Sequence, residues 1–440
     1  MGLRDRIVAE REQRAVQDGT EYYRRRLLEE VDFAELAELT DAQRRVRLER
    51  IVGQMVSREG PVMTTSQRTA LIRRVIDEAI GLGVLEPLLA DPSVTEIMVN
   101  GPGEVWVERD GRIEAADTRF SSEAQLYQTI DRIVSQVNRR VDESSPMVDA
   151  RLPTGERVNV IIPPLSLIGP VLTIRRFPRR FTLTELVEMG TLDEPTRRLL
   201  SALVRGRLNV VISGGTGAGK TTLLNALSSA ILERERIVTI EESAELQLQQ
   251  RHVISLEARP MNVEGKGEVT IRDLVRNSLR MRPDRIIVGE VRGVETLDML
   301  QALNTGHEGS LVTVHANTAD DALYRLETLA TMSDLHIPHA ALREYINNAI
   351  HAIVQIERGT DGTRRVCEVA VVASRRGEPF QLQTAMRLEL DPAAHDRAAA
   401  RPRHYSLPER ITDQLRLAAV EVPAAFALAA QAAAPRREAV

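Results

Sequence analysis

The chain has 440 residues, of which 43% are hydrophobic and 28% are charged, and its net charge is −5. This composition is that of a soluble globular protein, and the length predicts two or three domains. The single cysteine, Cys367, excludes an intramolecular disulfide framework and is typical of a reducing compartment. We expect no membrane-spanning helix and no export leader, because no apolar run approaches about 18 residues.

The first 81 residues are predicted to form a helical extension. Apolar residues recur at helical spacing amid dense mixed charge, with candidate caps at Thr40–Asp41 and Thr65–Ser66. The predicted helices are Arg4–Gln17, Tyr22–Glu38, Asp41–Val56 and Ser66–Gly81. Two interpretations of this extension remain open: an adaptor for a partner protein, or a solvated helical appendage.

Residues 82–178 are predicted to form a small α/β domain, because alternating apolar residues there are separated by turn signals. The predicted elements are strand Thr95–Asn100, a hairpin that turns at Asp110-Gly111, helix Glu123–Asn138, and strands Val158–Ile162 and Leu172–Phe177. A hinge is expected at Pro178-Arg179-Arg180, where this domain ends.

Residues 179–385 are predicted to form an α/β domain with a largely parallel sheet, because strands alternate with helices. The predicted elements are strands Leu208–Ser213, Arg236–Ile240, His252–Leu256, Ile286–Val288 and Ser310–Val314, and helices Ile271–Met281, Glu295–Leu303 and Asp320–Thr331. Residues 386–440 are rich in Ala, Arg and Pro. We expect a low-complexity tail there, disordered or loosely helical, with a membrane-anchoring helix as the alternative.

A glycine-rich stretch joins the apolar strand Leu208–Ser213 to a helix, and it matches the phosphate-binding loop pattern. The stretch consists of Gly214, Gly215, Thr216, Gly217, Ala218, Gly219, Lys220, Thr221 and Thr222. Glycines let backbone N–H groups surround phosphate oxygens, and the helix N-terminus adds positive potential. The pattern predicts a nucleotide site, with Lys220 on the β- and γ-phosphates and the Thr221 hydroxyl on Mg²⁺.

Three glutamates follow predicted strands and are candidates for catalysis. Glu290 follows the apolar stretch RIIVG, and it is the only acidic residue at that strand's end, so it is a candidate ligand for Mg²⁺ and its water. Glu241 and Glu242 end another strand, and one of them is a candidate general base. The alternative for each is a surface carboxylate that caps a helix.

Two histidines, His307 and His315, bracket the predicted strand Ser310–Val314. A metal site is possible in principle, but no third ligand stands at metal-binding spacing. The favoured hypothesis is that one or both sense the γ-phosphate, and the alternative is a structural role.

Arginines gather in the small α/β domain, and Arg157, Arg175 and Arg176 are candidate arginine fingers. Most such arginines are solvated or paired with carboxylates, but one or two are expected to reach a nucleotide in a neighbouring subunit.

Four stretches resemble the Walker A, Asp, Walker B and His boxes of the type II/IV secretion ATPase superfamily. They are the loop GGTGAGKTT, TIEE at Thr239–Glu242, RPDRIIVGEVRG at Arg282–Gly293, and TGHEGSLVTVHAN at Thr305–Asn317. Upstream, DPSVTEIMVNG, SSPMVDARLPTGERVNVIIPP and LTIRRF resemble the CpaF-type branch, which powers tight-adherence and Flp pili. The resemblance covers roughly residues 82–375, and it departs from the family pattern at Ala218 and Glu242, where serine and aspartate are usual.

The resemblance implies a RecA-like ATPase domain behind a smaller N-terminal domain, with ATP and Mg²⁺ as ligands. It also implies a homo-hexamer, cytoplasmic and peripheral at the inner membrane, that acts on the platform proteins of a pilus or secretion system. Direct contact with nucleic acid is not expected, because the chain is acidic and only 3% aromatic. A conjugative DNA-transfer ATPase is the alternative within motors, and a non-hydrolysing, nucleotide-gated scaffold is the alternative of another class.

Overall fold

In the computed structural model the chain forms two compact units, Met1–Phe177 and Pro178–Val440. The residues described are 19–20, 22–27, 29–31, 39–60, 63–109, 112–137, 139–177, 180–261, 266–333, 337–359, 361–378, 380–389, 400–427 and 436–438. The predicted helix Arg4–Gln17, the turn at Asp110-Gly111 and the hinge residues Pro178-Arg179 lie outside them. Every helix within the described ranges is too short or too polar to span a bilayer.

Helices open the first unit. Residues 22–27 are helical, and two longer helices follow, α3 (Asp41–Glu59) and α4 (Thr65–Ile80). Both begin with a capping box, in which the hydroxyl of Thr40 or Thr64 accepts from the backbone N–H three residues on, and a glutamine side chain returns the bond. The core that these helices share includes Tyr23, Leu27, Leu48, Val52, Val75 and Ile76.

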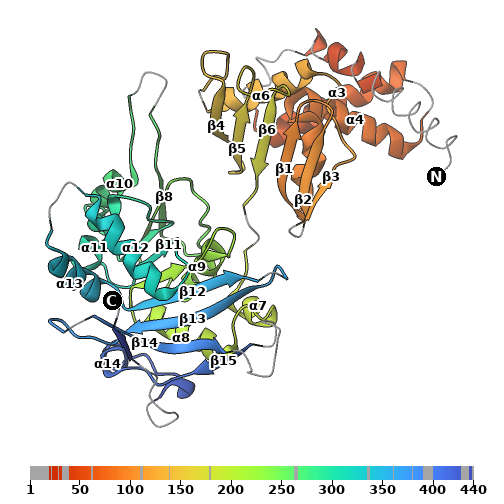
Figure 1. The fold of residues 1–440 in the computed structure, drawn as a ribbon. Coiled ribbons are helices and arrows are strands. Elements are labelled where there is room, and N and C mark those ends of the chain that lie inside the picture. The colour runs from red at the N-terminus through yellow and green to blue at the C-terminus, as the bar shows by residue number, and fades with distance from the viewer. Residues whose placement is uncertain are drawn as a thin grey trace. The chain divides into compact units, whose positions relative to one another are not determined.

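An antiparallel sheet forms the rest of the first unit, in the order β3-β2-β1-β6-β5-β4 (Figure 1). The strands are β1 (Val94–Asn100), β2 (Val105–Arg109), β3 (Arg112–Ala115), β4 (Met147–Arg151), β5 (Arg157–Ile161) and β6 (Val171–Arg175). One face of the sheet packs against α6 (Glu123–Gln136), and the short helices η1 (Gly83–Leu85) and α5 (Glu86–Ala90) precede it. Strand β4 was not predicted, because only Val148 of its five residues is buried.

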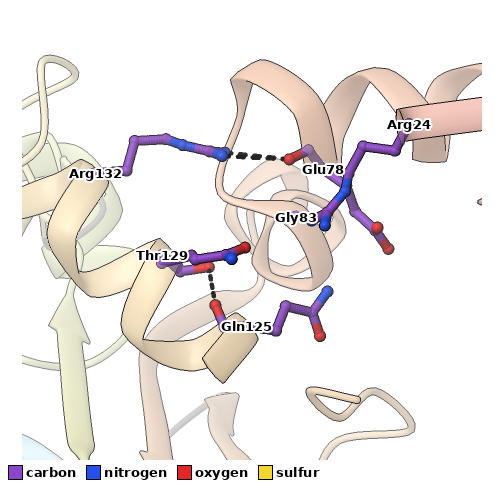
Figure 2. Close-up of a pocket in the computed structure, with 7 residues that line it drawn as sticks. Arg24, Glu78, Gly83, Gln125, Thr129 and Arg132 are labelled. Atoms are coloured by element: carbon purple, nitrogen blue, oxygen red, sulfur yellow. Dashed lines mark hydrogen bonds between the residues drawn. The ribbon is translucent and has the colours of Figure 1, made fainter. Parts of the chain in front are cut away.

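The helices and the sheet of the first unit are joined through Arg132 on α6. Its guanidinium donates to the carbonyl oxygen of Glu78, with N···O distances of 3.4 and 3.3 Å (Figure 2). It also donates to the carbonyl oxygen of Gly81. These carbonyls belong to the C-terminal end of α4, where four carbonyl groups lack partners within the helix. Burial lowers the pKa of Arg132. The arginine therefore caps α4 from a different element.

The second unit is built on a large sheet, in the order β15-β14-β13-β12-β7-β11-β10-β8-β9, with β16 paired to β14 (Figure 1). Neighbours from β12 to β9 are parallel, and β12 to β15 pair antiparallel. The strands are β7 (Val210–Ser213), β8 (Ile237–Glu241), β9 (Val253–Glu257), β10 (Arg285–Val288), β11 (Leu311–Val314), β12 (Ala352–Arg358), β13 (Arg364–Val372), β14 (Gln381–Glu389), β15 (Arg401–His404) and β16 (Arg436–Glu438).

Helices cover both faces of this sheet and create two cores. Along β7, Val210 and Ile212 face one core and Val211 faces the other, as the period of two in a strand requires. The helices are α7 (Leu183–Glu188), α8 (Glu194–Arg205), α9 (Lys220–Ser228), α10 (Ile271–Ser278), α11 (Glu295–Leu303), α12 (Ala319–Thr331), α13 (His339–Ala349), α14 (Glu409–Leu417) and η3 (Ala424–Phe426). The predicted α/β class with a mostly parallel central sheet is confirmed.

The expected disordered tail is wrong for the described residues 400–427. Strand β14 continues to Glu389, and β15 and α14 follow it. Leu407, Ile411 and Leu415 are buried in the core that also holds α9, together with Phe426. The spacing of four between these apolar residues is helical. The prediction missed these apolar residues because it relied on the overall composition of the segment, which is rich in Ala, Arg and Pro.

Candidate nucleotide site

The phosphate-loop sequence folds as a tight turn between β7 and α9. All four residues of β7 are buried, and α9 begins at Lys220. Gly217 and Gly219 have φ of 70° and 97°, a left-handed conformation that residues with a Cβ atom adopt at a cost. Gly214 is required for space, because a Cβ atom there would lie 2.3 Å from the carbonyl oxygen of Ile356. Gly215, Thr216 and Gly217 remain exposed.

Lys220 folds its ammonium group back over the loop. Its Nζ donates to the carbonyl oxygens of Gly214 and Gly215, at 3.0 and 3.1 Å, and lies 3.2 Å from Nε2 of His315. Burial lowers the pKa of Lys220, and the negative charge of Glu290 opposes that shift. The ammonium is thus held within reach of the loop, where a phosphate group offers stronger acceptors than two carbonyls.

Glu290, His315 and Arg292 form a charged cluster beside the lysine. Glu290 Oε1 lies 2.7 Å from His315 Nε2, and its Oε2 accepts from Arg292 Nη2 at 2.6 Å and Nε at 2.9 Å. Burial and the charge of Lys220 lower the pKa of His315. Because His315 follows β11 and Glu290 follows β10, parallel strands deliver both groups to one edge of the sheet.

Glu241 and Glu242 have different surroundings. Glu241 is buried at the end of β8, and its Oε1 accepts from the backbone N–H groups of Glu245 and Leu246 at 2.9 and 3.0 Å. Burial raises the pKa of Glu241 to about 7. Glu242 is exposed and bonds to Arg292. The buried carboxylate of Glu241 is therefore suited to accept a proton near neutral pH.

Gly289 lies next to the side chain of Glu241 and leaves room for it. A Cβ atom added at Gly289 would lie 2.7 Å from Glu241 Cγ and 3.2 Å from its Oε1. The backbone N–H of Gly289 donates to the carbonyl oxygen of Ile240 at 2.9 Å, which places β10 and β8 side by side at this level. The side chain of Glu241 therefore occupies the volume that a side chain at position 289 would fill.

The carboxyl edge of the sheet also holds buried polar atoms without hydrogen-bond partners in the described structure. They include Ser213 Oγ at the end of β7, Glu241 Oε2, and Oε1 of Gln355, which pairs with Ser213 in register. Leaving such an atom unsatisfied costs about 1–3 kcal/mol, so a cluster of them indicates a place for a ligand or for ordered water. Thr221 and Glu290 add the oxygen ligands that Mg²⁺ prefers. The residues present therefore fit a magnesium nucleotide.

His307 does not belong to this cluster, so the hypothesis that one or both histidines sense the γ-phosphate rests on His315. It precedes β11 whereas His315 follows it, so the two lie at opposite edges of the sheet. His307 Nδ1 lies 3.2 Å from the carbonyl oxygen of Ala302, near the end of α11. A strand carries its flanking residues to opposite edges. Within the described residues, no three His, Cys, Asp or Glu side chains gather where they could hold a metal ion.

The candidate arginine fingers all lie in the first unit. Arg157 and Arg175 are exposed cross-strand neighbours on β5 and β6. Arg176 has a structural use: its Nη1 donates to the carbonyl oxygen of Val94 at 2.9 Å and to that of Asp91. Assignment of Arg157, Arg175 and Arg176 to a nucleotide stays a prediction.

Sequence reasoning missed Arg292, whose guanidinium joins Glu290 and Glu242. It lies two residues after Glu290, within the stretch that drew attention to the strand. A side chain that bridges two carboxylates from different strands is invisible until the sheet order is known. Gln355 was missed for the same reason, since β12 becomes the neighbour of β7 only in the folded sheet.

A sequence model of the family described as "Type II/IV secretion system protein" matches residues 78–397. The chain belongs to this type II/IV secretion family. A putative conjugal transfer protein of Mycobacterium tuberculosis is 39% identical to this family member over 339 residues, covering 75% of the chain and 95% of the relative. The conjugal transfer protein TrbB of Rhizobium radiobacter is 35% identical over 309 residues, covering 69% and 91%. The type IV secretion system protein PtlH of Bordetella pertussis is 36% identical over 319 residues, covering 66% and 93%.

Solved structures similar to this family member include the VirB11 ATPase of the Brucella suis type IV secretion system, in complex with sulphate. That match has 29% identity and a TM-score of 0.36, and it covers 66% of this chain and 96% of the other. The pilus retraction motor PilT with bound ADP matches at 19% identity and a TM-score of 0.48, covering 69% and 81%.

Proposed function

We propose that this family member is an ATPase that hydrolyses Mg-ATP to drive transport through a type II/IV secretion or pilus machine. The observation that carries the proposal is that Lys220 and Glu290 both contact His315. Lys220 is the residue that follows the glycine-rich loop and begins α9. An ammonium, a carboxylate and an imidazole in one cluster supply phosphate binding, metal binding and a group that responds to the γ-phosphate. Family membership supports the same activity.

Each residue of the cluster has a defined task in this proposal. The backbone N–H groups from Gly215 to Thr221 surround the β-phosphate, and Lys220 leaves the loop carbonyls to bind phosphate oxygens. Thr221 and Glu290 would hold Mg²⁺, which would neutralise negative charge on the phosphates. When Lys220 moves in this way, it separates from His315. The imidazole of His315 then reports whether a γ-phosphate is present.

Glu241 is our candidate for the group that orients and deprotonates the attacking water. Its Oε1 is fixed by two backbone N–H groups, and its Oε2 is buried without a hydrogen-bond partner in the described structure. A pKa of about 7 suits a proton acceptor at neutral pH. Glu242, exposed and bound to Arg292, positions that arginine instead.

The wider setting is also a proposal. We infer a homo-hexamer at the cytoplasmic face of the inner membrane, in which Arg157 or Arg175 of one subunit completes the site of the next. A CpaF-type role in pilus assembly rests on the N-terminal stretches quoted above. A conjugative role is the second candidate, and relatives named for conjugal transfer, 35–39% identical to this chain, favour it. A nucleotide-gated scaffold is disfavoured, because binding alone does not require a water-activating carboxylate.

Lysine replacement tests the activity. Lys220→Ala should abolish ATP turnover, measured as phosphate release, because it removes the charge that binds the phosphates. Lys266 is the other lysine of the chain and is exposed, so Lys266→Ala is the matched control and should keep its turnover. Normal turnover in the Lys220 variant would remove the basis for this site. A wild-type chain that binds ATP without turnover would instead favour the scaffold.

A second variant separates binding from hydrolysis. Glu290→Gln should still bind Mg-ATP but hydrolyse it at least about 100-fold more slowly, since the charge that orients metal and water is lost. If ATP binding disappears instead, Glu290 is a structural residue.

Native mass measurement tests the assembly, with and without a slowly hydrolysed ATP analogue. The expected species is a hexamer, and a chain that stays monomeric with the analogue would contradict an intersubunit site. In the source cell, deletion of the gene should abolish pili if the protein has the CpaF-type role in pilus assembly. It should abolish DNA transfer if the protein has the conjugative role.

A further inference from the structure

The hairpin formed by β12 and β13 meets the phosphate loop of its own subunit. Strand β12 ends at Arg358 and strand β13 begins at Arg364. These two arginines are direct cross-strand partners. Both side chains are exposed. The candidate arginines found in the sequence all lie in the other unit, so this pair is a separate source of positive charge.

Two loop glycines lie next to these arginines. A Cβ atom at Gly219 would lie 3.1 Å from Arg364 Cδ, which is tighter than ordinary van der Waals contact. A Cβ atom at Gly217 would have Arg358 Nη1 as its nearest neighbour, at 3.9 Å. The missing side chain at Gly219 therefore leaves room for Arg364 beside the loop, whereas the distance at Gly217 is that of an ordinary van der Waals contact.

Arg364 also bonds directly to the loop. Its Nε donates to the carbonyl oxygen of Gly217 at 3.1 Å. Gly217 is exposed, and it is itself one of the loop's left-handed glycines, with a φ of 70°. A bond from a charged donor to this carbonyl fixes the orientation of the peptide group, and with it the neighbouring N–H that a phosphate needs.

The charge of the pair is not neutralised within the described residues. Neither guanidinium there forms an ion pair with a carboxylate, and the acidic residue of the hairpin turn, Asp361, accepts bonds from the hydroxyl and the backbone N–H of Thr363 instead. Two adjacent cations without a counter-charge repel one another, and a bound polyphosphate relieves that repulsion. An anion held in the loop is therefore the partner that this arrangement favours.

We propose that Arg364 is a positioning residue for the phosphate loop, and that Arg358 and Arg364 together strengthen binding of the nucleotide's phosphates from within the same subunit. This rests on the nucleotide site proposed above. The contact is to Gly217, in the part of the loop that surrounds the β-phosphate, and not to the cluster at His315. The pair therefore acts on ADP and ATP alike.

Calorimetric titration of the full chain with ADP, and with a slowly hydrolysed ATP analogue, tests the proposal. Arg364→Gln should raise the Kd about tenfold for both ligands, since a bond from a charged donor is lost. Arg364→Lys should recover part of that loss, because charge remains but the planar fork does not. Arg358→Gln should raise the Kd about threefold at low salt and less at high salt, because an exposed charge is screened.

Arg365→Gln is the matched control, because Arg365 is the next residue of β13 and pairs with Glu357 on the other face of the hairpin. Its Kd values should stay at the wild-type level, with unchanged circular dichroism in all variants. Wild-type affinity in Arg364→Gln would overturn the inference while leaving the nucleotide site intact. Weakening of the ATP analogue alone would also overturn it, since the pair would then face the γ-phosphate. A wild-type chain that binds neither ligand would instead remove the proposed function itself.

Discussion

Replacement of Glu241 by glutamine should remove a pH dependence from the stability of the second unit. Burial raises the pKa of Glu241 from 4.5 to about 7, so the folded chain binds this proton more tightly than the unfolded chain. The stabilisation is fully present below pH 4.5 and is lost as pH rises through 7. That gap between the two pKa values corresponds to about 3 kcal/mol in the free energy of unfolding.

Glutamine keeps the carbonyl-type acceptor for the N–H groups of Glu245 and Leu246 but has no charge to bury. Glu241→Gln should therefore gain stability relative to wild type as the pH rises from 5 to 8, by about 2.5 kcal/mol over that interval. Urea denaturation followed by circular dichroism measures it. The single tryptophan, Trp106, lies in the first unit, so its fluorescence transition is an internal reference that should not move. A difference between the two proteins that stays constant from pH 5 to 8 would refute the reasoning.

Three further substitutions should act on stability. Gly289→Ala should cost about 1–3 kcal/mol, because its new Cβ atom meets the buried carboxylate beside it, and denaturation midpoints measure this loss. Glu235→Gln should cost about 3–5 kcal/mol, because fully buried Arg285 loses its charge partner; wild-type stability would show that the pair is not needed. Arg132→Met should cost about 1–3 kcal/mol by uncapping α4, and it should shift the Trp106 fluorescence transition, which reports the same unit.

Short sequence patterns correctly predicted the loop turns, a helix cap and the buried strands, because neighbouring residues determine these features. The glycine-rich loop requires left-handed turns at fixed positions, and both Gly217 and Gly219 have them. The predicted cap at Thr40 is present, because its hydroxyl accepts from the backbone N–H of Gln43, three residues on. Runs of buried aliphatic residues predicted the parallel strands, because such strands are covered on both faces.

Contacts across the sheet could not be predicted, because they depend on strand order. The contact of His315 with Glu290 depends on the pairing of β11 with β10, which the sequence did not show. Arg364 follows the phosphate loop by more than a hundred residues and reaches it because β12 pairs with β7. The choice between Glu241 and Glu242 likewise needed the burial of one and the exposure of the other.

The C-terminal helix α14 has a consequence for the genetics of this protein. A frameshift after codon 390 would leave all four sequence boxes and every residue of the nucleotide site intact. It would also delete Ile411 and Leu415, which are buried in the core beneath α9, and the Leu415 side chain that packs against Gly206. An allele of this kind would keep the sequence signature of an active enzyme and lose the fold that supports it. Truncation in that region should therefore behave as a null mutation.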